Sequence, residues 1–152
     1  MLIHQRPKQT MKKTSFDVAY VIDDSKVAGK VHSKILQKLE LADAIRNYDN
    51  PVEGLKAVVS DLVQAKKVLL LVDLDMPNLN GVDFLEVLSK LSINPKQLSV
   101  YIISSTLGEH LHKEILYNPF VRRHLNKPLK KEELVIHQLK LLYKRKKGLQ
   151  AS

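Results

Sequence analysis

From residue 17 onward, short apolar runs alternate with amphipathic stretches, and this alternation repeats five times. The apolar runs are typical of buried strands, whereas the stretches between them carry apolar residues at helical spacing. The pattern predicts an α/β fold, a doubly wound parallel sheet of five strands with five helices on its two faces. The strands are expected at Val18–Ile22, Ala42–Arg46, Val68–Val72, Val100–Ile103 and Phe120–Leu125.

The five runs differ in polarity, and this difference indicates where each strand lies in the sheet. Val68–Val72 is continuously apolar, as expected of a central strand that is buried on both faces. The last run contains Arg122, Arg123 and His124, a polarity that suits an edge strand. The run from Ala42 is the weakest of the five.

Residues that favour helix starts precede the amphipathic stretches. Ser25 can cap the first helix, and Asn50-Pro51 supplies an N-cap and a first-turn proline for the second. Gly81 precedes a third helix, and a shorter fourth is expected from Leu107 to Tyr117. The apolar residues expected to share one face are Val27, Val31, Ile35 and Leu39 in the first helix, Val52, Leu55, Val59 and Leu62 in the second, Phe84, Leu85, Leu88 and Leu91 in the third, and Leu134, Val135, Leu139 and Leu142 in the last.

Length and composition fit one folded domain. The chain has 152 residues, of which 44% are hydrophobic and 27% charged, and this is ordinary globular usage. We expect the domain at residues 17–143, between basic tails at 1–16 and 144–152. The net charge of +9 would normally suggest nucleic acid or an acidic surface as a partner. Much of the excess lies at the two ends, so we interpret it first as solvated tails.

Cysteine usage and hydropathy bear on the compartment. The chain has no cysteine, which excludes disulfides, thiol catalysis and thiolate metal sites and fits a reducing compartment. No apolar run approaches the length of a membrane span, and the start lacks the apolar region of a secretory signal. A cytoplasmic protein is the simplest interpretation.

Polar residues of one chemical kind follow the predicted strands. Asp23, Asp24, Asp73, Ser104 and Lys127 all fall at carboxyl ends of strands, which converge at one edge of an open α/β sheet. Three carboxylates placed together repel one another, so a cation must compensate for their charge. Mg²⁺ suits this task because it prefers hard oxygen ligands. The pattern predicts a pocket with three carboxylates, an ammonium and a hydroxyl.

The stretch from Asp73 to Gly81 resembles the phosphoacceptor loop of response-regulator receiver domains, in which an Asp is followed by Met-Pro and then Gly. The pair Asp23-Asp24, the hydroxyl of Ser104 and the dipeptide Lys127-Pro128 are similar to the other marks of that family and occur in the same order. The resemblance covers residues 17 to about 143. It implies a flavodoxin-like fold of the chemotaxis-receiver type, with strand order 2-1-3-4-5.

The resemblance also implies the chemistry of the site. Asp73 would be the nucleophile that forms an aspartyl phosphate, and Asp24 and Asp73 would be the carboxylate ligands of Mg²⁺. Asp23 would act through an ordered water, and the backbone carbonyl of Asp75 would complete the protein ligands. Ser104 would close onto the phosphoryl group.

Three further features follow from the same resemblance. Lys127 would neutralise the phosphoryl group, and the peptide bond before Pro128 would be cis. Ser104 and His124 would form the switch that reports phosphorylation. His124 stands where the family has an aromatic residue, and its imidazole can titrate, so a pH-sensitive switch is a hypothesis.

As a member of that family the protein would be a stand-alone response regulator, not an enzyme in the usual sense, because it would catalyse only its own phosphorylation and dephosphorylation. Its partners would be a sensor histidine kinase or a histidine phosphotransfer protein, and a downstream protein to which it docks. Phosphorelay is an alternative role. Whether the molecule forms a homodimer stays open.

Two other classes remain as alternatives. A phosphatase of the haloacid dehalogenase type is one, because the stretch Val72-Asp73-Leu74-Asp75 also resembles its nucleophile loop. In that family, however, the loop follows the first strand and the acidic pair comes later in the chain. A basic nucleic-acid-binding adaptor is the other, although no helix-turn-helix segment follows the last predicted helix.

Overall fold

A computed structural model describes residues 14–105, 115 and 117–135, and it places five parallel strands in one sheet of order β2-β1-β3-β4-β5. This confirms the predicted fold class and strand order. The strands are β1 (Phe16–Ile22), β2 (Ala42–Tyr48), β3 (Val68–Asp73), β4 (Leu98–Ser104) and β5 (Val121–Asn126). All of β3 is buried and β5 is an edge, as the polarity of their runs predicts, and β2 is the other edge, as the expected strand order implies.

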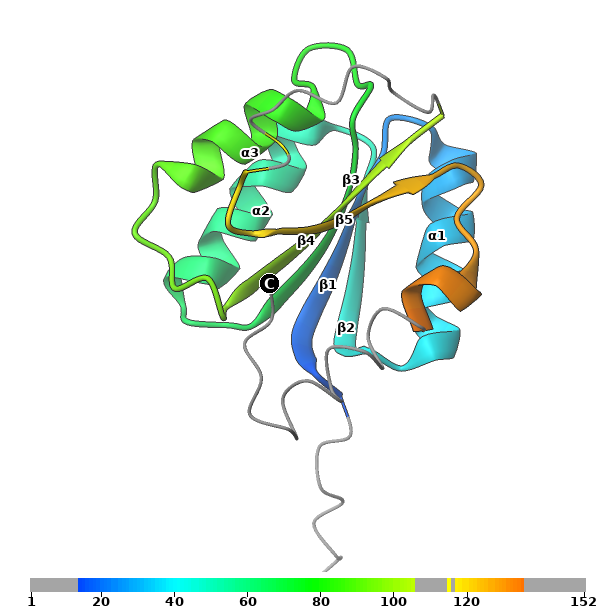
Figure 1. Cartoon of the computed structure of the whole chain (residues 1–152), viewed down its shortest axis with the longest axis horizontal. Coiled ribbons are helices and arrows are strands. Elements are labelled where there is room, and N and C mark those ends of the chain that lie inside the picture. Colours follow the sequence, from blue (N-terminus) through cyan, green and yellow to red (C-terminus); the bar gives the residue numbers. More distant parts are fainter. Residues whose placement is uncertain (1–13, 106–114, 116, 136–152) are drawn as a thin grey trace, which may run out of the picture.

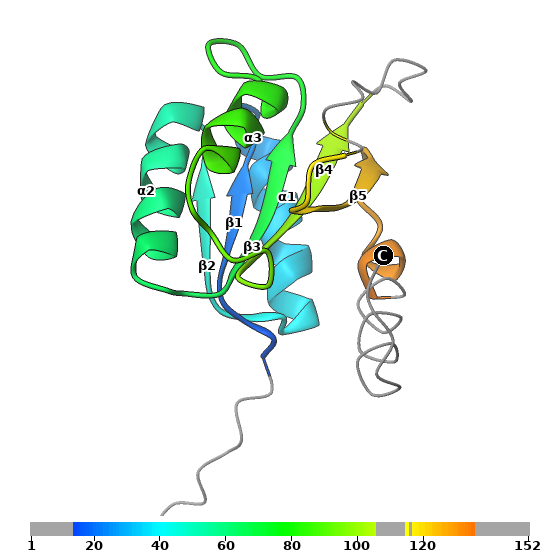
Figure 2. The same cartoon turned by 60° about the vertical axis from the view of Figure 1, so that its left-hand side comes forward.

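Helices cover both faces of the sheet. In Figures 1 and 2, α2 (Pro51–Val63) and α3 (Gly81–Ser89) lie on one face, whereas α1 (Lys26–Leu39) and the short helical stretch at residues 131–135 lie on the other. The predicted caps are present: Ser25 accepts a hydrogen bond from the Ala28 N–H, and Asn50 caps α2. The expected fourth helix and the continuation of the last one fall largely outside the described residues.

Alternate residues of the strands pack into two separate hydrophobic cores, one on each face of the sheet. Val18, Tyr20 and Ile22 of β1 point to the face covered by α2 and α3, whereas Ala19 and Val21 point to the face covered by α1. This alternation follows from the two-residue repeat of a strand. Because neither face of the central strands is left to solvent, the strand ends hold fixed positions.

The predicted inner face of α1 was wrong in its first half. Val27 and Val31 are 75% and 48% exposed, and the buried positions are Gly29, His32 and Leu36. Residues four apart turn by about 40° relative to one another in a helix of 3.6 residues per turn. The predicted row therefore winds from the solvent side to the core, so that only its later members pack against the sheet.

Gly29 lies on the side of α1 that faces the sheet. A Cβ at Gly29 would lie 2.6 Å from the side-chain oxygen of Asn47 on β2, so a larger residue here would require the Asn47 side chain to move. The predicted apolar row of α2 also winds from solvent toward the core. Its first member, Val52, is 43% exposed, whereas Leu62 at its end and the neighbouring Val58 are buried. The sequence pattern identified the helices correctly but placed their inner faces imprecisely.

A buried carboxylate ties α2 to the sheet. Asp61 is 3% exposed and accepts hydrogen bonds from the Tyr20 hydroxyl of β1 and from the Lys66 ammonium at 2.9 Å. The guanidinium of Arg46 on β2 lies 3.8 Å from the same carboxylate. Burial alone would raise the pKa of Asp61, but these hydrogen bonds and the nearby positive charges outweigh burial and hold the pKa below its ordinary value of 3.8.

Replacing Asp61 by Asn is expected to lower the free energy of unfolding at pH 7 by about 1–3 kcal/mol, because hydrogen bonds to a charged group are lost. The pKa of Asp61 is lower in the folded than in the unfolded chain, so its stabilisation is present above pH 3.8 and is lost as pH falls through the folded pKa. The difference in the free energy of unfolding between the parent and Asp61→Asn should therefore shrink as pH falls. Urea unfolding measured at neutral and acidic pH checks both points.

Asp49→Asn is a matched control, because Asp49 pairs with Lys26 at 3.6 Å on the surface and its side chain is 47% exposed. Its effect should stay below about 0.5 kcal/mol. An Asp61→Asn protein as stable as the control at pH 7 would contradict this view of the buried carboxylate.

Candidate functional site

The carboxyl ends of four strands bring the candidate site residues together. Asp23 follows β1, Asp73 ends β3, Ser104 ends β4 and Lys127 follows β5. One carboxylate oxygen each of Asp23, Asp24 and Asp73 lies within 4.8 Å of the others. Asp23, Asp73 and Ser104 are buried, whereas Asp24 is exposed. The structure thus gathers three acidic residues at the carboxyl ends of β1 and β3, and Ser104 and Lys127 follow on the β4 and β5 side of them.

Short-range hydrogen bonds hold two of the carboxylates in place. Asp23 Oδ1 accepts from the Ser25 N–H at 2.9 Å, and Asp73 Oδ1 accepts from the Asp75 N–H at 3.1 Å. Each carboxylate accepts from the backbone N–H two residues later, which is the Asx-turn that Asp commonly forms, and here both turns follow the end of a strand. The second oxygen of each carboxylate is left for other contacts.

Gly81 shapes the loop after β3. A Cβ at this position would lie 2.9 Å from the carbonyl oxygen of Asp73 and 3.0 Å from Leu74 Cα. The Gly81 N–H donates to the Leu74 carbonyl at 3.0 Å and closes the loop. Asn78, within this loop, has φ of 67°, a left-handed conformation that asparagine tolerates. The glycine therefore lets the start of α3 approach the backbone beside Asp73.

Lys127 brings its positive charge to the buried carboxylates. Its ammonium lies 2.9 Å from Asp23 Oδ2 and 3.1 Å from Asp73 Oδ2. The contact with Asp73 is a hydrogen bond, whereas the contact with Asp23 is an ion pair without hydrogen-bond geometry. Burial by itself would lower the pKa of Lys127, but the two carboxylates outweigh burial and raise the pKa. The peptide bond between Lys127 and Pro128 is cis.

The pKa of Asp73 differs from that of an ordinary carboxyl. Burial raises the pKa of Asp73 from 3.8 to about 6, and the negative charge of Asp23 adds to the rise. The hydrogen bonds from Lys127 and from the Asp75 N–H work in the opposite direction. Burial dominates because the charged form loses water that two donors do not replace. Asp73 is thus mostly ionised at pH 7, and its ionised form lowers the stability of the folded state.

Ser104 connects the acidic cluster to β5. Its hydroxyl oxygen lies 2.7 Å from His124 Nε2, within hydrogen-bond distance. Burial lowers the pKa of His124, and the charge of Asp75 acts in the opposite direction. The imidazole is therefore neutral at pH 7. The two residues that the resemblance names as a switch are in direct contact.

The donor set fits a hard divalent cation. The cluster offers three carboxylates, and the one ammonium in contact with two of them leaves negative charge uncompensated. Oxygen ligands with a negative charge are what Mg²⁺ selects. The residues present therefore suit this ion, while the part assigned to the carbonyl of Asp75 stays a prediction.

Sequence reasoning missed His32, which lies beneath the cluster. The side chain is 3% exposed on the inner face of α1, and its Nδ1 lies 3.8 Å from Asp23 Oδ2. His32 lies three residues after Gly29 and four before Leu36, and the structure shows that these three residues form the buried face of α1. Only the later members of the predicted apolar row, Ile35 and Leu39, lie on the same side of the helix as His32.

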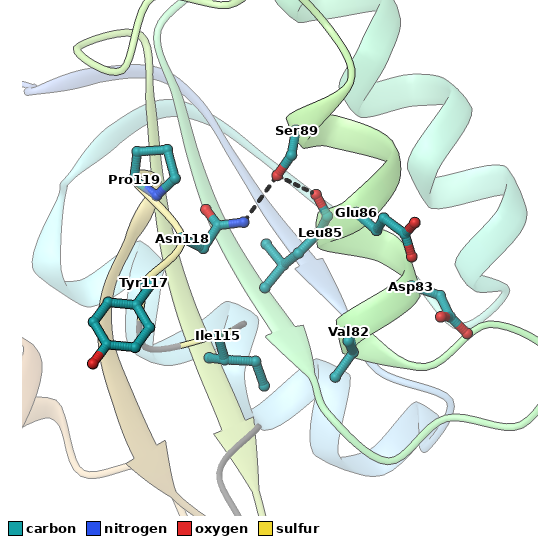
Figure 3. A pocket seen from close by; sticks show the side chains of 9 residues that line it. All are labelled: Val82, Asp83, Leu85, Glu86, Ser89, Ile115, Tyr117, Asn118 and Pro119. Carbon is teal, nitrogen blue, oxygen red and sulfur yellow. Dashed lines mark hydrogen bonds between the residues drawn. The ribbon is translucent and has the colours of Figure 1, made fainter. Parts of the chain in front are cut away.

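A separate hollow lies between α3 and the residues Ile115 and 117–119 (Figure 3). The Asn118 amide crosses it and donates to Ser89 Oγ at 2.9 Å, and that hydroxyl donates to the Leu85 carbonyl at 2.8 Å. None of the three clustered aspartates, Ser104 or Lys127 lines this hollow. It is distinct from the acidic site.

An open parallel sheet of order β2-β1-β3-β4-β5, with three acidic residues, a hydroxyl and an ammonium at its carboxyl edge, defines the receiver class of flavodoxin-like proteins. The family model for the response regulator receiver domain matches residues 19–138. The chain belongs to the response regulator receiver family.

Solved structures with similar folds include several response regulators. A two-component response regulator from Cytophaga hutchinsonii has a TM-score of 0.71 and 18% sequence identity, over 84% of this chain and 98% of that chain. The CheX-CheY-BeF3-Mg complex from Borrelia burgdorferi has a TM-score of 0.67 and 19% identity, over 83% of this chain and 89% of that one. At these identities the similarity shows the fold alone.

A two-component system response regulator/GGDEF domain protein is 26% identical, with a TM-score of 0.66. The match covers 84% of this chain but only 50% of that protein, so this chain corresponds to about half of its length. No protein matches in the comparison with curated sequences.

Replacing Asp73 by Asn is expected to stabilise the metal-free protein at pH 7 by up to about 3 kcal/mol. The rise of its pKa from 3.8 to about 6 corresponds to that energy at roughly 1.4 kcal/mol per pH unit. A carboxyl whose pKa is higher in the folded state favours folding below pH 3.8, and this benefit is lost as pH rises through about 6. The gain from Asn should therefore vanish below pH 3.8.

Urea unfolding with a chelator, at several pH values, measures this difference. Asp75→Asn is the control, because Asp75 is exposed and its carboxylate is not one of the three clustered ones. Its effect should stay within about 0.5 kcal/mol. An Asp73→Asn protein that is less stable than the parent at pH 7 would show that the site does not strain the fold.

Proposed function

We propose that this protein receives a phosphoryl group on Asp73 from a histidine kinase or a histidine phosphotransfer protein. The phosphorylated form would then dock to a downstream protein or pass the group on in a phosphorelay. One observation carries the proposal: the ammonium of Lys127 contacts the buried carboxylate of Asp73 beside two further aspartates. Membership of the receiver family supports it.

Asp73 would act as the nucleophile. One of its carboxylate oxygens forms a bond to phosphorus while the bond from phosphorus to the donor's imidazole nitrogen breaks, and that nitrogen then takes up a proton. A pKa of about 6 keeps Asp73 mostly ionised at pH 7, which the attack requires. Phosphoryl transfer needs little covalent help, so the protein contributes alignment and charge neutralisation.

Mg²⁺ would be held by the carboxylates of Asp24 and Asp73, by Asp23 through a water, and by the backbone carbonyl of Asp75. The ion supplies positive charge that offsets the repulsion between the phosphoryl oxygens and the aspartates. The three clustered carboxylates support this assignment, because the single ammonium of Lys127 does not balance their charge.

Lys127 would neutralise the phosphoryl group, since its ammonium is already in contact with Asp73 Oδ2. Ser104 would donate its hydroxyl hydrogen to a phosphoryl oxygen. This hydrogen bond would change the contact between Ser104 and His124, and so carry the phosphorylation state to β5. An added phosphate carries close to two negative charges, enough to bias such a contact.

The same family membership leaves the phosphatase alternative without support. Asp73 ends the third strand along the chain and the acidic pair follows the first, which is the receiver arrangement. Within the described residues, no helix has the length and apolar character needed to cross a membrane. We propose a cytoplasmic site of action, in reach of a kinase.

Incubation with phosphoramidate and Mg²⁺ should add one phosphoryl group to the parent chain and none to Asp73→Asn, because only the parent carries the nucleophile. Intact mass measures the adduct. EDTA should abolish it, since the charge repulsion is then uncompensated. Asp49→Asn, a change at a surface carboxylate outside the cluster, should be phosphorylated like the parent. An adduct on Asp73→Asn would contradict the assignment of the nucleophile.

Removal of the Ser104 hydroxyl should separate phosphorylation from signalling. Ser104→Ala is expected to accept the phosphoryl group but to leave the amide resonances of β5 unmoved on phosphorylation, whereas Ser104→Thr keeps the hydroxyl and should respond like the parent. NMR spectra recorded with and without beryllofluoride and Mg²⁺ test this. If Ser104→Ala shifted the β5 resonances as fully as the parent does, Ser104 would not be the link.

A further inference from the structure

Two buried polar atoms next to the acidic cluster have no hydrogen-bond partner among the described residues. They are His32 Nδ1 and Asp23 Oδ2, and they lie 3.8 Å apart. We propose that His32 is a positioning residue for Asp23: its Nδ1–H donates to the Asp23 carboxylate when the site holds Mg²⁺ and a phosphoryl group. The proposal rests on the function proposed above and extends it to a residue on the far side of the cluster.

The position of His32 is fixed by the way α1 sits on the sheet. Gly29, one turn earlier, lies in close contact with Asn47 of β2, and Leu36, one turn later, is buried in the core. The Ser25 cap holds the start of the same helix directly after the acidic pair. These contacts leave the imidazole facing Asp23 with little freedom to turn away.

The chemistry allows only one kind of hydrogen bond between the two groups. An ionised carboxylate can only accept, so Nδ1 must carry the hydrogen. A neutral imidazole suffices for this, and burial favours the neutral form by lowering the pKa of His32, against the charge of Asp23. At 3.8 Å the contact is longer than a hydrogen bond, and site contacts often shorten only when the ligand is bound.

A second donor matters because Lys127 serves two carboxylates at once. Its ammonium lies 2.9 Å from Asp23 Oδ2 and 3.1 Å from Asp73 Oδ2. A phosphoryl group on Asp73 adds close to two negative charges and attracts that ammonium. Asp23 Oδ2 would then lose part of its only cationic contact among the described residues. His32 Nδ1, which lies 3.8 Å from Asp23 Oδ2, would then donate a hydrogen bond in place of the contact with Lys127. Asp23 would thereby keep its orientation toward the metal and its water.

A purely structural histidine is the competing explanation. In that case the imidazole fills space under the acidic pair, and an apolar side chain of similar size would serve as well. The two explanations differ in one property, which is the need for a hydrogen-bond donor at the place of Nδ1. Leucine and asparagine have nearly the same shape, and only asparagine offers an amide N–H at about that place. The pair His32→Leu and His32→Asn therefore isolates the hydrogen bond.

The experiment measures the dissociation constant of Mg²⁺ by calorimetry, in the presence of beryllofluoride, for the whole chain as parent, His32→Leu and His32→Asn. Urea unfolding in EDTA checks that each variant is folded. Loss of a hydrogen bond that orients a metal-binding group typically weakens metal affinity by about 10- to 100-fold. We expect a loss of this size for His32→Leu and a largely restored affinity for His32→Asn.

A His32→Leu protein that binds Mg²⁺ as tightly as the parent would overturn the proposal, and so would equal losses in both variants. If His32→Leu does not fold, the ¹⁵N spectrum of the parent decides: the Nδ1–H tautomer of His32 in the complex supports the proposal, and the Nε2–H tautomer refutes it. A parent that binds no Mg²⁺ at all would instead contradict the proposed function. The two failures are thus distinguishable.

Discussion

The contact of one ammonium with two buried carboxylates is the interaction on which the site depends. Two like charges about 4 Å apart repel by about 1 kcal/mol in water and by about 4 kcal/mol at the effective dielectric of a protein surface. Asp23, Asp24 and Asp73 lie within 4.8 Å of one another, and Lys127 is placed between the two that are buried. The cluster is held together with charge still uncompensated, and this makes it receptive to a divalent cation.

The fold supplies the rigidity that this arrangement needs. The strand that carries Asp73 is buried along its whole length, and the neighbouring strands feed separate cores on the two faces of the sheet. Away from the site, the buried carboxylate of Asp61 behaves in the opposite way. Its hydrogen bonds and positive neighbours lower its pKa, whereas burial raises the pKa of Asp73. One aspartate stabilises the fold at neutral pH, and the ionised form of the other destabilises it.

Much of the fold and of the site could be predicted from the sequence, because both depend on where apolar runs begin and end. The runs located the strands, and the polar residues after them located Asp23, Asp73 and Lys127. The inner faces of the helices were harder to predict, since apolar valines at 27 and 31 face solvent and a histidine at 32 faces the core. That exchange depends on how α1 packs on the sheet, where Gly29 faces Asn47 of β2, a contact between elements that spacing along the chain does not encode.

The most direct test of this account is a crystal structure of the protein with Mg²⁺ and beryllofluoride. We expect beryllofluoride bonded to a carboxylate oxygen of Asp73, Mg²⁺ bound between Asp24 and Asp73, and both Ser104 and Lys127 in contact with the fluorine atoms. A structure with the metal bound elsewhere, or with Lys127 turned away from an empty Asp73 under saturating ligand, would contradict it.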